Sequence, residues 1–375
     1  MHVPDGFLDA PTSLATGVTA AGAVALSLRG ARRELSASPV TGATAGAAGP
    51  GAERTAPLAG LAAAFIFAVQ MLNFPVAAGT SGHLLGGALA AILVGPFTGV
   101  LCVSVVLLLQ AIMFADGGLT ALGTNITCMA VVTVVVAHLV FRTLLRVLPA
   151  GRSTVTASAF VAALVSVPAS ALFFTLLYAV GGTTDVPIGR VAAAMGGVHV
   201  LIGIGEGVIT ALTVGAVVAV RPDLVHGARG LTRPLKLKVN GELVDAPARQ
   251  AAPAAAPRSS RAVWLTGLAA SLVLAGFVSF YASASPDGLE KVAADHGIDK
   301  AAEEHAVADG PLADYGVGGV DDERLSAGLA GVIGVGVTAA VGTGVLLVVR
   351  RRGTTARSAA DGAAVREGAA GRPEA

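Results

Sequence analysis

Charged and aromatic side chains are both scarce in this chain. Charged residues make up 13% of its 375 residues and aromatic residues 4%, whereas about a quarter of an ordinary soluble domain is charged. Hydrophobic residues reach 54%, and the 49 Gly residues suit close packing of helices in lipid. The composition therefore indicates a membrane protein. The formal net charge of +1 gives no charge field that would favour nucleic acid as a partner.

Cysteines and catalytic motifs are also lacking. The two cysteines, Cys102 and Cys128, are too few for a disulfide framework or a thiolate metal cluster. The sequence has no Walker A motif, no HExxH, no GxSxG and no GxGxxG that opens a strand-to-helix unit. We therefore expect no enzyme and no nucleotide hydrolysis by the chain itself. The opening residues lack a basic region ahead of an apolar stretch, so we expect no cleavable signal peptide and a mature chain that begins at Met1.

Apolar windows long enough to cross about 30 Å of hydrocarbon predict nine membrane spans. The windows lie at 12–28, 57–75, 83–96, 97–114, 122–141, 157–180, 192–219, 262–283 and 326–349. The third and fourth form one continuous run, which we divide at Gly95-Pro96 because that pair favours a turn. The expected fold class is an all-α polytopic membrane protein with a seven-span helical bundle and a two-span C-terminal unit.

Basic residues predict the orientation of these spans. If the N-terminus lies outside, 21 of the 25 Lys and Arg residues fall on the cytoplasmic side. The four that remain outside are Arg190, Lys291, Lys300 and Arg324. This asymmetry predicts a multi-pass protein of the plasma membrane, with its N-terminus extracellular and its C-terminus cytoplasmic.

Two segments rich in Ala, Pro, Gly and Ser, at 36–56 and 246–260, predict linkers. The second separates two units. The expected organisation is a seven-span domain at 1–225, a cytoplasmic linker at 226–261, a two-span domain at 262–352 and a disordered cytoplasmic tail at 353–375. Between the last two spans, residues 285–325 hold eleven acidic and three basic residues. This excess favours a solvated, partly disordered outer loop over a weak cation-gathering surface.

Position two of a free chain is a ready chelating site, and His2 occupies it. The amine of Met1, the amide nitrogen of His2 and its imidazole can close one five-membered and one six-membered ring around a metal ion. Three nitrogens in a plane favour copper(II) or nickel(II) over zinc, and cobalt(II) also fits. His83 lies in the loop FPVAAGTSGHLLGG, on the same predicted side as Met1. The alternative for His83 is a helix start, capped by Ser81, with the imidazole bonded to a backbone carbonyl.

Polar residues in or near the predicted spans are further candidates. His199 and Glu206 are seven residues apart, which is two turns along one helix face. Because their depths in the membrane differ, we interpret them as structural residues or as supports of the ligands. Asn125, at the end of a span, could orient a ligand or satisfy a loop backbone. Asp5 and Asp116 could attract a cation or serve the structure.

Four motifs together resemble the CbiM/NikM family, the substrate-capture membrane subunits of nickel and cobalt energy-coupling-factor transporters. They are the opening MHVPDGFLDAP, then AVQMLNFPVAAGTSGHLLGG, GGLTALGTNIT and GVHVLIGIGEGVIT. The likeness covers residues 1–225. Beyond the linker, SPDGLE at 285–290 resembles the small accessory subunit CbiN/NikN, here fused to the same chain.

The resemblance implies a substrate-binding component that imports Ni(II) or Co(II) without a catalytic cofactor. It implies that the metal is held by the Met1 amine, the His2 amide nitrogen and imidazole, and the His83 imidazole. It also implies partners, a transmembrane coupling subunit and cytoplasmic ATPases, and an accessory unit needed for loading or release of the metal. Two alternatives remain: a metal-dependent membrane enzyme and an ion-coupled secondary transporter driven through Glu206. The donor set does not separate nickel from cobalt.

Overall fold

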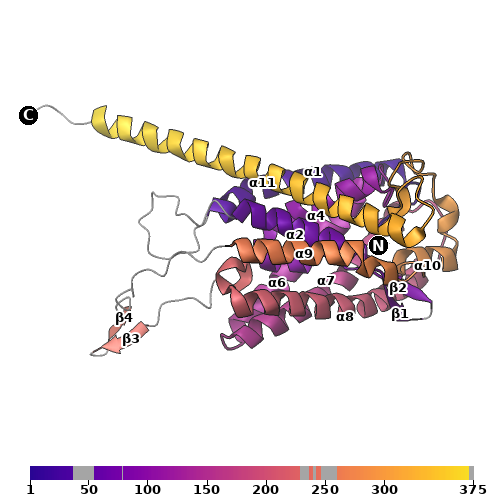
Figure 1. Cartoon of the computed structure of the whole chain (residues 1–375), viewed down its shortest axis with the longest axis horizontal. Coiled ribbons are helices and arrows are strands. Elements are labelled where there is room, and N and C mark those ends of the chain that lie inside the picture. The colour runs from indigo at the N-terminus through magenta and orange to yellow at the C-terminus, as the bar shows by residue number, and fades with distance from the viewer. Residues whose placement is uncertain (37–54, 78, 229–235, 240–241, 246–259, 371–375) are drawn as a thin grey trace, which may run out of the picture.

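The computed structural model is a bundle of long helices that run side by side, which confirms the predicted all-α polytopic fold (Figure 1). It describes residues 1–36, 55–77, 79–228, 236–239, 242–245 and 260–370. The helices are α1 (Ala10–Ser36), α2 (Thr55–Gln70), α3 (Gly87–Val94), α4 (Pro96–Met113), α5 (Leu122–Asn125), α6 (Thr133–Val147), α7 (Arg152–Gly181), α8 (Ile188–Val220), α9 (Arg261–Gly276), α10 (Gly288–His296) and α11 (Glu323–Ala370). The strands form two hairpins, β1 (Phe74–Ala77) with β2 (Thr80–Gly82) and β3 (Lys236–Val239) with β4 (Glu242–Asp245).

Seven helical segments in the described part of the chain are long and apolar enough to cross a membrane. They comprise α1, α4, α5 continued through a π-helical stretch into α6, α7, α8, α9 and α11. Two of the nine predicted spans are shorter. The window 57–75 contains α2, whose 16 residues rise about 24 Å. The window 83–96 contains α3, which has only eight residues.

The segment 83–96 is only partly helical, which corrects the prediction of a helix that starts at His83. Residues 83–86 have no regular structure, and α3 follows them. Gly86 has φ 84°, a left-handed conformation that glycine adopts without steric cost. The predicted division at Gly95-Pro96 is confirmed, because α3 ends before Gly95 and Pro96 begins α4.

Non-helical backbone at membrane depth must find its hydrogen bonds inside the protein. Glu206 on α8 supplies two of them, because its carboxylate oxygens accept from the backbone N–H of Leu85 at 2.7 Å and of Gly86 at 3.2 Å. Gln70, at the end of α2, donates from Nε2 to the Leu85 carbonyl at 2.9 Å. Glu206 is fully buried. These bonds give it a structural task at the break before α3.

The C-terminal unit packs directly on the bundle, since both α9 and α11 lie against α2 (Figure 1). Glycine permits the close approach of α11. A Cβ atom at Gly60 on α2 would lie 2.1 Å from the hydroxyl oxygen of Thr343 on α11. A Cβ atom at Gly334 on α11 would lie 2.1 Å from the ring of Phe67 on α2. Such glycine-lined contacts are typical of helix pairs in lipid, where packing rather than the hydrophobic effect drives association.

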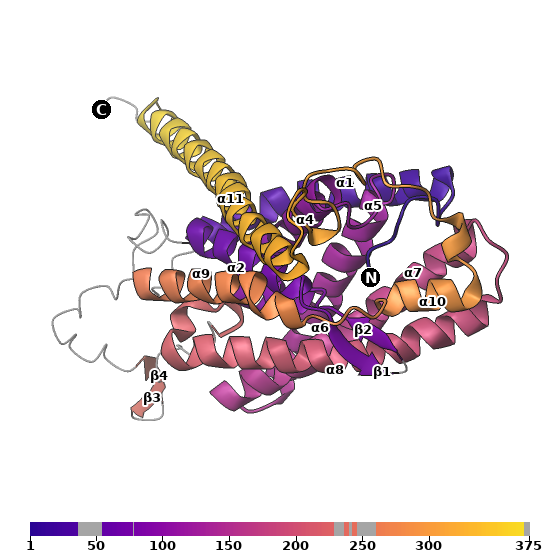
Figure 2. The same ribbon diagram turned by 45° about the vertical axis from the view of Figure 1, so that its right-hand side comes forward.

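The connection between α9 and α11 lies against the bundle and is ordered, which corrects the partial disorder predicted at 285–325. Ten of the eleven acidic residues in that segment are exposed, as predicted for a solvated loop. The connection contains α10 and runs across the end of the bundle where Met1 lies, here called the Met1 end (Figure 2). The hydroxyl of Ser81 donates to the carbonyl of Ser285 at 2.7 Å, so Ser81 ties the β1–β2 hairpin to this connection and does not cap a helix. The backbone N–H of Glu303 donates to the Asp5 carbonyl at 3.0 Å.

Most residues of the predicted linkers lie outside the described part of the chain. The linkers predicted at 36–56 and 246–260 lie almost entirely outside the described residues. Within the linker predicted at 226–261, the structure describes the β3–β4 hairpin. Where the sequence predicts a disordered tail from residue 353, α11 continues as a helix to Ala370.

Candidate metal site

The first residues of the chain lie inside the Met1 end of the bundle. Met1 is 2% exposed and Val3 is fully buried. Asn125 holds the main chain of Val3 at two points: its Oδ1 accepts from the Val3 N–H at 2.8 Å and its Nδ2 donates to the Val3 carbonyl at 3.1 Å. The backbone N–H of Gly118 donates to the same carbonyl at 2.9 Å. Asn125 thus satisfies backbone groups and, through Val3, helps to fix the two residues before it.

Asp5 anchors the chain two residues further on. Its carboxylate accepts hydrogen bonds from the backbone N–H groups of Leu119 at 3.0 Å, Thr120 at 2.8 Å and Ala121 at 3.2 Å. Gly118 leaves the room for this contact, since a Cβ atom there would lie 2.2 Å from Oδ1 of Asp5. Of the two tasks that the sequence leaves open for Asp5, the geometry supports the structural one.

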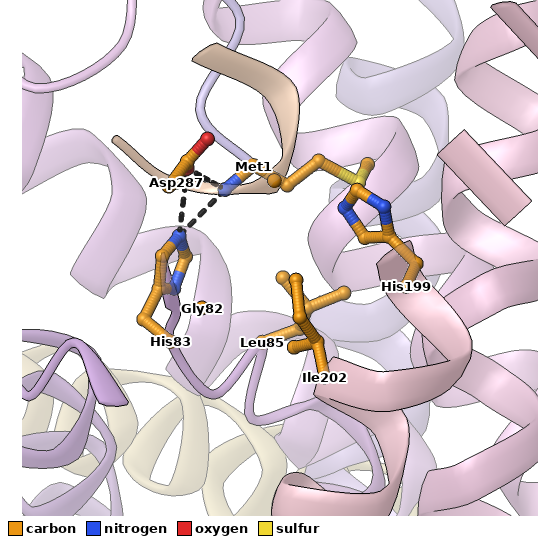
Figure 3. A pocket seen from close by; sticks show the side chains of 8 residues that line it. Met1, Gly82, His83, Leu85, His199, Ile202 and Asp287 are labelled. Carbon is orange, nitrogen blue, oxygen red and sulfur yellow. Dashed lines mark hydrogen bonds and ion pairs between the residues drawn. The ribbon is translucent and has the colours of Figure 1, made fainter. Parts of the chain in front are cut away.

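Three polar groups from distant parts of the sequence meet at Met1 (Figure 3). The terminal amine lies 2.6 Å from Nε2 of His83 and 2.5 Å from Oδ2 of Asp287, and these two atoms lie 3.4 Å apart. The side chains of Met1, His83 and Asp287 are 1%, 5% and 10% exposed. Nδ1 of His83 lies 3.1 Å from the Leu84 carbonyl, which can only accept, so Nδ1 carries the proton. Nε2 therefore presents its lone pair to the amine.

His2 lies beside this group with its ring parallel to that of His83. The two ring centroids are 5.0 Å apart and the planes differ by 8°. Nδ1 of His2 lies 2.9 Å from Oδ1 of Asp116, whose Oδ2 accepts a hydrogen bond from the Tyr315 hydroxyl at 2.5 Å. Nε2 of His2 is buried and has no hydrogen-bond partner among the described residues. The six-membered chelate ring uses Nδ1, so chelation requires the ring to exchange Asp116 for the metal by turning about its Cβ–Cγ bond.

Burial and neighbouring charges shift the pKa values of these groups. Desolvation, reinforced by the charge of the terminal ammonium, lowers the pKa of His83, which favours the neutral imidazole that a metal needs. Desolvation alone would raise the pKa of Asp287, but the charge of the terminal ammonium outweighs it and holds that pKa well below its ordinary value. In the same way, His2 outweighs desolvation and lowers the pKa of Asp116 to about 2. The site therefore combines a neutral His83 with two ionised carboxylates.

His199 borders the same small pocket from α8 (Figure 3). The pocket is lined by Met1, Gly82, His83, Leu85, His199, Ile202, Asp287 and Gly288. Nδ1 of His199 is bonded to the carbonyl of Met195 at 2.8 Å, one turn back along the helix. The structure thus gathers Met1, His2 and His83, and leaves His199 in the wall of the pocket.

The sequence analysis missed two residues of the site, Asp287 and Tyr315, which both come from the C-terminal unit. Asp287 lies in SPDGLE, and the acidic excess of the connection that contains it was the available signal for a carboxylate near the amine. Tyr315 carries no comparable signal. Within the described residues, no three His, Cys, Asp or Glu side chains are arranged to hold a metal ion. The polar cluster at Met1 consists of the terminal amine and the side chains of His83 and Asp287.

Two family models match the chain, and several known proteins are similar to it. Residues 2–224 match a family described as the cobalt uptake substrate-specific transmembrane region (CbiM), and residues 261–351 match the PDGLE domain. A protein of Archaeoglobus fulgidus, provisionally named fused nickel transport protein NikMN, is 33% identical over 345 residues, which are 91% of this chain and 97% of that protein. A provisionally named metal transport protein of Haloquadratum walsbyi is 40% identical over 225 residues, 60% of this chain and 93% of that protein. A crystal structure of a transition metal transporter aligns over 59% of this chain and 93% of that one, with a TM-score of 0.49 and 24% identity.

Proposed function

Since the chain belongs to the CbiM family and is a metal transport component, we propose that it is the substrate-binding membrane subunit of an energy-coupling-factor ABC transporter that imports divalent nickel or cobalt. The fused nickel transport relative and the cobalt uptake family support both metals as substrates. The metal is cargo and not a catalytic cofactor.

One observation carries the proposal: the terminal amine lies 2.6 Å from Nε2 of His83, and His2 lies against His83. These groups supply the Met1 amine, the amide and imidazole of His2 and the imidazole of His83. Four nitrogen donors suit nickel(II) and cobalt(II), which prefer nitrogen over the oxygen ligands of magnesium or calcium. The burial of Met1 and His83 keeps competing water away from them.

The partners in this proposal are a transmembrane coupling subunit and separate cytoplasmic ATPases. The absence of a Walker A motif from the whole sequence is consistent with this division of labour. The concentration of Lys and Arg in the segments 29–54, 142–152, 221–261 and 350–372 supports an arrangement in the plasma membrane with the Met1 end outside and the C-terminus inside.

A secondary transporter driven through Glu206 receives no support from the geometry. Both oxygens of Glu206 accept hydrogen bonds from the main chain before α3. A carboxylate that satisfies buried backbone groups is expensive to release for ion coupling. The secondary transporter would be favoured instead if cells that lack every coupling ATPase took up the metal with this chain, and if Glu206→Gln abolished that uptake.

The test is metal binding by the purified chain. We would measure the stoichiometry and affinity for nickel(II) and cobalt(II) with the parent chain, His2→Ala, His83→Ala and a variant with one residue added before Met1. We expect one tight site in the parent, lost in all three variants, because each removes or displaces a nitrogen donor.

His296→Ala is the matched control. Its imidazole lies on α10 and bonds to the Val292 carbonyl at 2.9 Å, away from the amine. It should bind metal as the parent does. Tight binding by the extended variant would show that the terminal amine is not a ligand. Tight binding by His83→Ala would show that His83 is not a ligand.

A further inference from the structure

Asp287 belongs to the C-terminal unit, yet its carboxylate reaches the metal donors of the N-terminal unit. Its Oδ2 lies 2.5 Å from the Met1 amine and 3.4 Å from Nε2 of His83, and the two nitrogens are 2.6 Å apart. Two ligands that are each about 2.1 Å from one ion, at right angles to each other, lie about 3.0 Å apart. The two contacts of the amine are shorter than this and are those of a hydrogen-bonded ammonium, so the three atoms are close enough together to reach a single cation once the amine has lost a proton.

The two oxygens of this carboxylate have separate tasks. Oδ1 accepts from the backbone N–H groups of Leu289 at 2.7 Å and Glu290 at 2.9 Å, and so caps the N-terminus of α10. Glu290 completes the capping box by accepting from the backbone N–H of Asp287 at 2.8 Å. Capping fixes the carboxylate in the structure, while Oδ2 is directed at the amine and His83.

Contacts with α8 and with the β1–β2 hairpin hold the connection between α9 and α11 close to the bundle. Gly288 allows α10 to approach α8, since a Cβ atom there would lie 2.9 Å from Cδ1 of Ile202. The backbone N–H of Ser81, two residues before His83, donates to the carbonyl of Pro286 at 2.9 Å. The same strand end that positions His83 thus positions the residue before Asp287.

Charge balance gives this carboxylate a reason to remain in the site. The terminal ammonium and the Asp287 carboxylate neutralise each other at a buried position, where an unpaired charge is costly. When a divalent cation binds, the ammonium loses one proton to solvent and the His2 amide loses a second. Among the groups in contact with the amine, the cation and the single amide anion then leave one positive charge in excess, which the carboxylate of Asp287 again neutralises; Asp116, which is bonded to the Tyr315 hydroxyl, lies outside this count.

We propose that Asp287 is a further ligand of the transported divalent cation, bound through Oδ2, so that the PDGLE unit and the N-terminal unit hold one cation together. The inference rests on the proposed function, because it assigns an oxygen ligand to the same nitrogen site. Asp287 exchanges its ion pair with the ammonium for a bond to the metal, the two protons pass to solvent, and the hydrated cation gives up the water molecules that the protein ligands replace.

The test measures nickel(II) and cobalt(II) binding by the full chain with Asp287→Asn and Asp287→Ser. Both substitutions retain an oxygen that can cap α10. Asn keeps the shape and loses the charge, whereas Ser is too short to reach the amine. We expect each to weaken metal binding at least 10-fold and to change the visible absorption spectrum of bound cobalt(II), which reports its ligands.

Asp295→Asn is the control, because Asp295 lies on the same helix and pairs with Lys291 at the surface. It should leave affinity and spectrum unchanged. Parental affinity and spectrum in Asp287→Asn and Asp287→Ser would overturn the inference and restrict Asp287 to pairing with the ammonium. A parent chain that binds neither metal would overturn the proposed function instead.

Discussion

Asn125 and Val3 are joined by two hydrogen bonds, one in each direction between the side-chain amide and the main chain, at 2.8 and 3.1 Å. The side-chain amide of Asn125 thereby pairs with the main chain of Val3 in the way that the main chain of a neighbouring strand would. The amine that carries the proposed metal site is two residues away from this contact.

We predict that Asn125→Ala weakens metal binding roughly 10-fold or more. The substitution leaves buried Val3 backbone groups without their side-chain partner, a loss of about 1–3 kcal/mol that loosens the terminal strand. Competition with a chelator measures the affinity. Asn73→Ala is the control, since Oδ1 of Asn73 has no hydrogen-bond partner among the described residues. Equal affinities for Asn125→Ala and the parent would show that other contacts suffice to hold the strand.

Glu206→Gln should destabilise the chain and disturb the metal site together. Gln puts an NH2 group in place of one of the two carboxylate oxygens that accept from Leu85 and Gly86, so one buried N–H loses its acceptor at about 1–3 kcal/mol. Because these residues follow His83 closely, metal affinity should fall as well. Thermal unfolding in detergent and metal titration provide the two readouts.

Glu34→Gln is the control for Glu206→Gln. It is the same substitution at a carboxylate that also accepts from two backbone N–H groups, at the opposite end of the bundle. Glu34 accepts from the backbone N–H groups of Phe97 at 3.1 Å and Thr98 at 2.7 Å, at the start of α4. It should lower the unfolding temperature and leave metal affinity unchanged. Loss of metal binding in both variants would mean that general destabilisation, and not the position of His83, explains the effect of Glu206.

Gly288→Ala should lift α10 from α8. A Cβ atom at this position would lie 2.9 Å from Cδ1 of Ile202 and 3.0 Å from Cε1 of His199, so either these side chains must shift or the helix must move away. We expect several-fold faster hydrogen exchange in the connection between α9 and α11, measured by mass spectrometry. Gly197→Ala is the control, because nothing lies within 4 Å of a Cβ atom there. Unchanged exchange in Gly288→Ala would indicate that the pocket adapts to the extra methyl group.

Asp9 caps α1, because its Oδ1 accepts from the backbone N–H of Thr12 at 2.9 Å. Hydrogen bonds from the side chain and main chain of Thr12 lower the pKa of Asp9 from 3.8. A lowered pKa in the folded state means that the ionised form adds stability above about pH 4, and that this gain is lost as pH falls through the lowered pKa. Asp9→Ala should therefore unfold at a lower temperature than the parent at pH 7, with a smaller difference at pH 3.

Asp9→Asn separates the charge from the cap. Asparagine caps helices about as well as aspartate but does not titrate. At pH 7 its unfolding temperature should stay near that of the parent. Towards pH 3 it should not show the loss of stability that protonation of Asp9 causes in the parent. A pH profile that is the same for Asp9→Asn and the parent would contradict a role for the ionised Asp9.

Much of the fold follows from the sequence because lipid imposes a length. A segment that crosses the hydrocarbon must be apolar over about 20 residues, and this requirement is visible without any tertiary contact. The prediction failed at 83–96, where an apolar run of 14 residues, cut from a longer run at Gly95-Pro96, proved to be helical only from Gly87. Apolar composition does not reveal a broken helix when its backbone partners, Glu206 and Gln70, come from elsewhere in the chain.

By itself, the sequence determined the membrane class of the protein, its family motifs and the chelating potential of Met1 and His2, since those properties depend on composition and on neighbours along the chain. Only the tertiary structure brought Asp287 to the amine across 286 residues and Asp116 to His2. The acidic excess of residues 285–325 is equally compatible with a solvated surface, because charge along a sequence does not specify which carboxylate is buried. The packing of α10 on α8 decides which carboxylate is buried. It desolvates Asp287, one of eleven acidic side chains, beside the terminal ammonium with which it pairs.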